Sequence, residues 1–221
     1  MPDTLQRGLA VQMVETLRER LLSGQIASGT RINEVELARE LNISRGPLRE
    51  AIRQLVSEGL LVHRPNKGAV VFEAEPDEVE ALFELRSALE TAAARLAAVR
   101  RDRKDITALR RACERSRKLL AAGRQFVHHT DLDFHRALLD AARSPRITEQ
   151  VWRVHQQIIV VRSRQDVPGS HTDASLADHE ELAEAIAEGQ ADRAAELMEG
   201  HLDRVRLQMI ASMKGSGASR D

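Results

Sequence analysis

Residues that favour β-strands gather in only one stretch of this chain, from Leu60 to Phe72. Elsewhere leucine, alanine, glutamate and arginine dominate, and apolar residues recur at the three- and four-residue spacing of an amphipathic helix. One short strand region cannot build a sandwich or a parallel sheet, because both need several strands. The sequence therefore predicts a mainly α protein with one small β-hairpin.

The first 73 residues predict a helix, a short helix, a tight turn, a third helix and the hairpin. Asn33 is placed to cap the short helix, with Glu36 as its capping-box partner, and Ser44 to cap the third helix. This order of elements is typical of a winged helix-turn-helix. We expect that domain over residues 1–73 and a polar linker over residues 74–77.

Six helical segments follow the linker, with Gly123 and Gly189 as helix-ending punctuation. We expect them to form an all-α six-helix bundle over residues 78–215. The expected segments are 77–101, 103–122, 126–142, 145–164, 175–188 and 191–213.

Composition indicates the cellular compartment in which the protein is expected. It has 221 residues, of which 42% are hydrophobic and 30% charged, and no run approaches the roughly 18 apolar residues of a membrane span. The N-terminus lacks the apolar core of a secretory signal. The single cysteine, Cys113, excludes an internal disulfide, fits a reducing compartment and is expected in the core. We expect a cytoplasmic protein with no membrane partner.

The third helix carries a stripe of three arginines, Arg45, Arg49 and Arg53, beside its apolar side. Arginine donates paired hydrogen bonds to guanine or binds phosphate, so this helix suits the major groove of DNA. The Ser44 hydroxyl and the amides at the helix start suit a phosphate.

The hairpin turn at Asn66 and Lys67 is a candidate wing tip for the minor groove. The alternative interpretation of the arginine stripe is a solvated face whose charges pair with acids, Glu50 and Glu58 being near enough.

Ionisable residues interrupt the inward faces of the C-terminal helices. Asp131 and His135 share one face, and His179 and His201 stand among apolar residues of two later helices. Buried ionisable groups are costly unless they are paired or bind a metal. Imidazole and carboxylate suit zinc, nickel or manganese, so these four residues are candidate ligands of one divalent ion.

Arg86 interrupts the apolar stripe of the first helix after the linker. A guanidinium there needs an anionic partner, which we expect to be the carboxylate of a bound effector. The alternative is a permanent pair with Glu90, one turn away. The other histidines show no such pattern and are expected at the surface or at element ends: His63, His128, His129, His155 and His171.

The segment from Gly29 to Leu61, GTRINEVELARELNISRGPLREAIRQLVSEGLL, resembles the signature of the GntR family of bacterial transcription regulators. The resemblance implies that Ser44, Arg45 and Arg49 contact operator DNA and that Asn66 and Lys67 lie in the wing.

The segment Asp131-Leu-Asp-Phe-His135, with His179 and His201 downstream, is similar to the FCD effector domain of the FadR-type subfamily. Metal-binding members of that group use an aspartate and three histidines in this order. With six expected helices instead of seven, the C-terminal domain resembles the VanR-like branch of that subfamily. Arg86 matches an arginine that faces the ligand pocket in the family. The resemblance implies a bound divalent metal, zinc first and nickel or manganese otherwise.

The sequence thus predicts a regulator, not an enzyme. We expect a homodimeric repressor that binds an inverted repeat in operator DNA and responds to a small organic acid at the metal. One alternative is a regulator for which the ion itself is the signal. A second is a metallohydrolase, which would need a general base beside the metal-bound water, and no HExxH motif is present.

Overall fold

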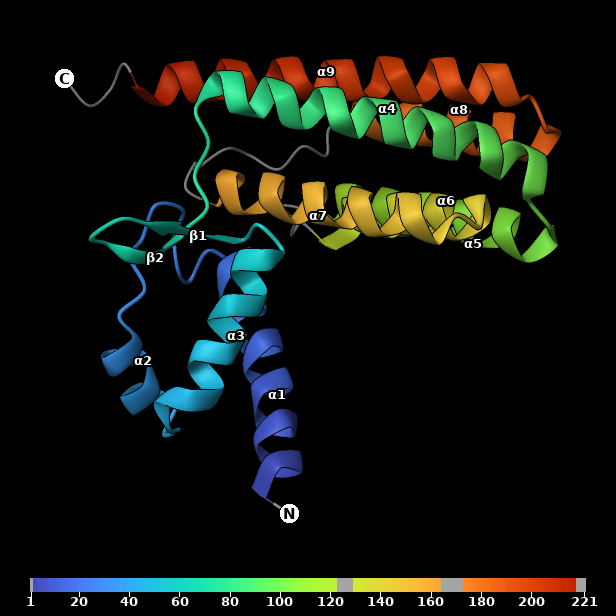
Figure 1. Cartoon of the computed structure of the whole chain (residues 1–221). Helices are drawn as coiled ribbons and strands as arrows, with labels where there is room; N and C mark the ends of the chain where they lie inside the picture. Colours follow the sequence, from blue (N-terminus) through green and yellow to red (C-terminus); the bar gives the residue numbers. More distant parts are fainter. Residues whose placement is uncertain (1, 123–128, 164–172, 218–221) are drawn as a thin grey trace. The chain divides into compact units, whose positions relative to one another are not determined.

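The computed structural model describes residues 2–122, 129–163 and 173–217, with side chains over 8–122, 132–163 and 173–214 (Figure 1). Two compact units make up the chain. The first, here called unit 1, comprises Met1–Glu75 and His155–Asp166, and unit 2 comprises Pro76–Val154 and Val167–Asp221. The described residues form a mainly α fold with one hairpin, which confirms the predicted fold class.

Unit 1 contains the predicted elements in the predicted order. They are α1 (Pro2–Leu22), α2 (Glu34–Glu40), α3 (Arg45–Ser57), β1 (Leu61–Arg64) and β2 (Gly68–Val71). Helix α3 packs against α1, α2 and β1. This is a winged helix-turn-helix in which β1 and β2 form the wing.

A side-chain cap at Asn33 explains where α2 begins. The Asn33 side-chain oxygen accepts hydrogen bonds from the backbone N–H groups of Val35 and Glu36, as expected of an N-cap. Ser44 occupies the N-cap position of α3, but its hydroxyl makes no capping hydrogen bond there. Between the helices Asn42 has φ +52°, a left-handed conformation that asparagine tolerates and that closes the tight turn.

The wing is a two-stranded antiparallel hairpin in which Leu61 pairs with Val71 and Arg64 with Gly68. Arg31 adds an isolated antiparallel bridge to Val70. The Val71 N–H also donates to the Thr30 carbonyl at 2.9 Å. The pairing of Arg31 was not predicted, because so short a stretch shows no periodicity.

Unit 2 consists of the six predicted helices, each within a few residues of its expected bounds. They are α4 (Pro76–Arg100), α5 (Arg103–Ala121), α6 (His129–Ala142), α7 (Pro145–Arg162), α8 (Asp173–Glu188) and α9 (Ala191–Gly217). Helix α7 also contributes its last residues to unit 1. Helices α4 and α9 lie side by side, and α4 also packs on α6 and α8 (Figure 1).

The core of unit 2 is built from the apolar stripes of these helices, with many alanines that allow close helix contact. Among its buried members are Ala93, Leu109, Phe134, Leu182 and Met198. Cys113 belongs to the same core and is 5% exposed, as predicted, and burial raises the pKa of its thiol to about 12.

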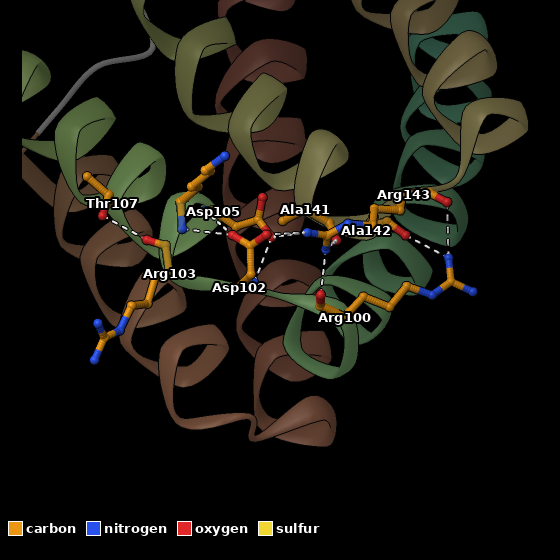
Figure 2. Close-up of polar contacts among 9 residues, drawn as sticks. Arg100, Asp102, Arg103, Asp105, Thr107, Ala141, Ala142 and Arg143 are labelled. Atoms are coloured by element: carbon orange, nitrogen blue, oxygen red, sulfur yellow. Dashed lines mark hydrogen bonds and ion pairs between the residues drawn. The ribbon is translucent and has the colours of Figure 1, made fainter.

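Two arginines cap each other's helices where α4 meets the end of α6 (Figure 2). Arg100 donates to the Ala142 carbonyl at 2.7 Å, and the Arg143 guanidinium donates back to the Arg100 carbonyl. Arg143 also pairs with Asp102, the N-cap of α5, at 3.0 Å. These bonds satisfy helix-end carbonyls that have no partner within their own helices. Among the described residues, no helix is long and apolar enough to cross a bilayer.

Candidate DNA interface and candidate metal centre

The arginine stripe of α3 faces solvent, as the sequence predicted. The side chains of Arg45 and Arg49 are each 54% exposed and that of Arg53 is 73% exposed. On the other side of the helix Leu48 and Leu55 are fully buried. Burial of the apolar side therefore fixes α3 with its arginines directed outwards.

Glu34 of α2 pairs with two of these arginines. Its Oε2 accepts a hydrogen bond from Arg49 Nε at 2.7 Å and lies 4.0 Å from Arg45 Nη2. A guanidinium held through Nε can still present its two terminal NH₂ groups to an acceptor, so this pair orients Arg49 without consuming it.

The contact of Glu34 was not predictable from helical spacing, because Glu34 precedes Arg49 by 15 residues and reaches it only through the tight turn. The expected partner Glu50 does pair with Arg53, at 3.0 Å. Glu58, the other acid named in the alternative interpretation, pairs with Arg18 of α1 and not with the stripe.

The predicted wing residues lie at the exposed turn between β1 and β2. Asn66 has φ +62°, and the Lys67 N–H donates to the Arg64 carbonyl at 3.1 Å, which closes the turn. Ser44 is exposed at the start of α3. The structure thus places Ser44, the arginine stripe and the wing tip on the exposed surface of unit 1.

Three of the four predicted metal ligands converge inside unit 2. His135 of α6, His179 of α8 and His201 of α9 are 0%, 1% and 1% exposed. One ring nitrogen from each lies within 4.8 Å of the others, and His179 Nε2 is 3.3 Å from His201 Nε2. Asp131 lies in α6 one turn before His135, but its side chain is outside the described part of the chain.

Carboxylates hold the outer nitrogens of two of these rings. His135 Nδ1 lies 2.5 Å from Glu90 Oε2, and His201 Nδ1 lies 3.1 Å from Asp178 Oδ2. In metal sites the second ring nitrogen of a histidine ligand almost always donates to such a group, which fixes the ring and its tautomer. Here the carboxylates lie at Nδ1 of His135 and His201, so the Nε2 atoms of both rings are on the side of the cluster.

Two further contacts support this arrangement. Phe134 stacks on His179 with ring centroids 4.1 Å apart and planes 9° apart, which fixes that ring as well. Asp178 also pairs with Arg204. Burial alone would raise the pKa of Asp178, but the His201 hydrogen bond and the Arg204 guanidinium hold it below its usual value, so this carboxylate stays ionised.

Arg86 lies beside the histidines, buried to 4% exposure. Its Nε donates to Glu90 Oε1 at 2.5 Å, and its Nη2 is 3.2 Å from His135 Nε2. The internal pair with Glu90 that sequence analysis left open is therefore present. Because Glu90 uses its two oxygens for Arg86 and His135, it connects the guanidinium to the histidine cluster.

The expectation for His155 was wrong, since it is 2% exposed. It lies on the apolar stripe of α7 with Val151 and Ile158, a spacing that would have revealed its burial. His63 is exposed as expected. His128 and His171 fall outside the described residues, as does the side chain of His129.

A surface groove of about 670 Å³ between α4 and α9 contains none of the predicted ligands. Its lining has five acids, Glu80, Glu84, Glu196, Glu199 and Asp203, and one arginine, Arg206, which pairs with Glu80 and Asp203. Such a wall repels an organic anion, so the groove does not fit the expected acid effector.

Two protein-family models match this chain, one within unit 1 and one mostly within unit 2. Residues 9–71 match the family described as bacterial regulatory proteins, gntR family, and residues 81–204 match the FCD domain. The chain is 30% identical to the Nta operon transcriptional regulator of Aminobacter aminovorans, over 85% of this chain and 88% of that protein. It is 29% identical to the probable D-xylose utilization operon transcriptional repressor of Paenarthrobacter nicotinovorans, over 88% and 85%.

A solved structure has the same fold. The putative GntR transcriptional regulator from Rhodococcus sp. RHA1 superposes with a TM-score of 0.78 at 23% identity, covering 92% of this chain and 98% of that one. The family match spans more than half of the sequence and accounts for the exposed arginine helix. This chain belongs to the GntR family of bacterial regulatory proteins and is a DNA-binding transcriptional regulator with a C-terminal FCD domain.

Proposed function

We propose that this regulator is a homodimeric repressor whose unit 2 holds a divalent metal and releases operator DNA when a small organic acid binds there. The observation that carries the proposal is the buried convergence of three histidines, two of them oriented by carboxylates. Repression is supported by the relative from Paenarthrobacter nicotinovorans, which is named a probable repressor.

Operator recognition is assigned to α3 and the wing. One recognition helix contacts few base pairs, so a two-fold pair of helices on an inverted repeat is the usual route to affinity. Because Glu34 holds Arg49 through Nε, the terminal nitrogens of Arg49 can reach two acceptors on a guanine.

The test of this assignment is the operator affinity of Arg45→Ala and Arg49→Ala, measured by fluorescence anisotropy at one salt concentration. Removing an arginine that contacts a base should weaken the free energy of operator binding by about 1–3 kcal/mol. Arg146→Ala is a matched control, because that side chain is 96% exposed and lies outside unit 1. Unchanged affinity in both test variants would contradict the assignment.

The histidine cluster fits a metal ion by its donors. Three imidazoles supply borderline ligands that suit zinc first and nickel or manganese otherwise, and Asp131 is the proposed fourth ligand from the resemblance. Such an ion, when bound, would act as a Lewis acid toward a carboxylate oxygen of the effector. The chain's own contribution is to hold the rings through Glu90, Asp178 and Phe134 and to exclude bulk water by burial.

Elemental analysis of the purified protein tests the metal centre, with about one divalent ion expected per chain. His179→Gln and His201→Gln should lose the ion, and chelation should lower the melting temperature because bound metal stabilises the folded state. His63→Gln is the control, since His63 is exposed in unit 1. Wild-type metal content in both test variants would exclude this ligand set.

The effector is proposed to bridge the metal and Arg86. A guanidinium carries five N–H donors, so Arg86 can keep its Nε bond to Glu90 while its terminal nitrogens bind a second carboxylate. The acid would then lie next to His135, since Arg86 Nη2 already approaches that ring. The groove between α4 and α9 has an acidic excess in its lining, which disfavours an anion there.

Arg86→Lys separates effector binding from folding. Lysine keeps a positive charge near the buried Glu90 but cannot bind two groups through a planar fork. We expect operator binding to persist and release by candidate carboxylic acids to be lost. If the variant still responds to the acid with wild-type affinity, Arg86 is not its partner. If metal alone changes operator affinity and no acid does, the ion itself is the signal.

A further inference from the structure

Helix α4 is apolar on two opposite sides. Its inward side is built from residues such as Val79, Phe83 and Ala97, which are at most 1% exposed. On the far side Leu85 is 47% exposed and Val99 is 66% exposed. A second apolar side that is exposed on an otherwise polar surface often marks a contact with another protein surface.

The exposed side forms one continuous stripe. At about 100° per residue, seven positions of α4 fall within roughly 80° of arc directly opposite the buried side. The first of them is Glu78, in the first turn of the helix. The six positions that follow Glu78 are all apolar, and we call them the α4 stripe: Ala81, Leu85, Ala88, Ala92, Leu96 and Val99. Ala92 and Leu96 are half-buried, Leu96 partly against the core of unit 2, and the other four are exposed.

The α4 stripe is approximately symmetric about residue 90. Ala81 and Val99 are its ends, Leu85 and Leu96 come next, and Ala88 and Ala92 flank the middle. A second copy packed antiparallel about a two-fold axis there would place Leu85 against Leu96 of the partner subunit. The alanines would meet at the axis, where small side chains allow close helix approach. Such self-complementarity is what an isologous interface requires.

Charged residues beside the stripe obey the same symmetry. Glu84 and Arg95 lie along one edge of it, both exposed. The antiparallel pairing would place Glu84 against Arg95 of the partner subunit, and opposite charges at that position favour this register. Within the chain Arg95 pairs with Asp192 at 3.0 Å, and both side chains are exposed enough for Arg95 to serve a second carboxylate.

We propose that the α4 stripe is the surface on which a second copy of this chain packs, antiparallel and centred on residue 90. The inference rests on the proposed homodimer and specifies its contact. It has a regulatory consequence, because Arg86 and Glu90 lie on the buried side of the same helix. A shift of α4 when the effector site is filled would alter the two-fold contact directly, and with it the spacing of the two recognition helices.

The test is the dimer dissociation constant of the full-length chain, measured by analytical ultracentrifugation. Leu85→Asp should raise the dimer dissociation constant about 100-fold or more, because the substitution buries an unpaired carboxylate at the contact. Leu207→Asp is the matched control: Leu207 is 53% exposed on α9 and lies outside the stripe. Its dissociation constant should equal that of the wild type.

Disulfide trapping tests the register. The double variant Ala88→Cys with Ala92→Cys should cross-link quickly between subunits, because each new thiol faces the other across the axis. Either single variant should cross-link slowly, whereas parallel packing would make both single variants fast. The native Cys113 is buried with a raised thiol pKa and should not compete.

The outcomes separate this inference from the proposed function. A wild-type dimer unaffected by Leu85→Asp would overturn the α4 contact and leave the repressor proposal standing. A monomeric wild type would overturn both the contact and the homodimer. Fast cross-linking of the single variants would overturn the antiparallel register. We expect Leu85→Asp to dissociate the dimer and Leu207→Asp to leave it intact. We also expect rapid cross-linking of the double cysteine variant and slow cross-linking of each single variant.

Discussion

Replacing Arg86 with methionine should destabilise unit 2 by about 3–5 kcal/mol, the usual cost of leaving one member of a buried ion pair alone. Glu90 is 0% exposed, and its Oε1 lies 2.5 Å from Arg86 Nε. Without that guanidinium the carboxylate would remain far from water. Methionine fills much of the volume of the arginine stem, so the loss would reflect charge more than a cavity.

A double-mutant cycle isolates the pair. Glu90→Gln alone leaves the Arg86 cation without its counter-ion, so it should also be strongly destabilising. The combined variant removes both charges, and the glutamine carbonyl can still accept a hydrogen bond from His135 Nδ1. We expect the double variant to be more stable than either single one, with a coupling energy of about 2 kcal/mol or more.

The measurement is urea unfolding followed by fluorescence of Trp152, the one tryptophan of the chain, which lies in unit 2. The exposed pair Arg110 and Glu184 is a control, because its side chains are 57% and 55% exposed. Replacing both side chains of that pair with neutral ones should leave the midpoint of urea unfolding nearly unchanged. The reasoning would be refuted if Arg86→Met lowered the free energy of unfolding by less than about 1 kcal/mol. It would also be refuted if the double variant were no more stable than either single variant.

Three further predictions follow from single contacts. Glu34→Gln should raise affinity for random DNA, because a negative charge near the phosphates is lost, and lower the ratio of operator to random affinity, because Arg49 loses its 2.7 Å anchor. Anisotropy with both duplexes measures this, and an unchanged ratio would exclude an orienting role. Cys113, with its thiol pKa raised to about 12, should be almost entirely protonated at about pH 8 and react with an aromatic disulfide reagent only after denaturant is added. Fast labelling of the native protein would contradict that burial. Arg143→Ala should be less stable in urea than Arg143→Gly by about 1 kcal/mol, because both lose the side-chain bonds while only glycine adopts the native φ of +48° without penalty. Equal losses would show that the left-handed backbone costs nothing there.

Much of the fold was predictable because its signals are local. Helical spacing of apolar residues, the Asn33 cap and the single strand-rich stretch all act within a few residues along the chain. The arginine stripe of α3 was equally visible, since a helix with one apolar side must turn the other outwards. The convergence of His135, His179 and His201 was anticipated from their inward positions and from the family resemblance.

Only the tertiary structure decided which polar groups meet. Glu34 reaches Arg49 across a tight turn, and Asp178 reaches His201 from another helix. Glu90 was foreseen as a partner of Arg86, but its second contact, with His135, joins residues 45 positions apart. Periodicity states which side of a helix is buried, but not which residue of a neighbouring helix lies opposite. That choice depends on the crossing angle and offset of packed helices, which are set by the whole core and not by any one segment.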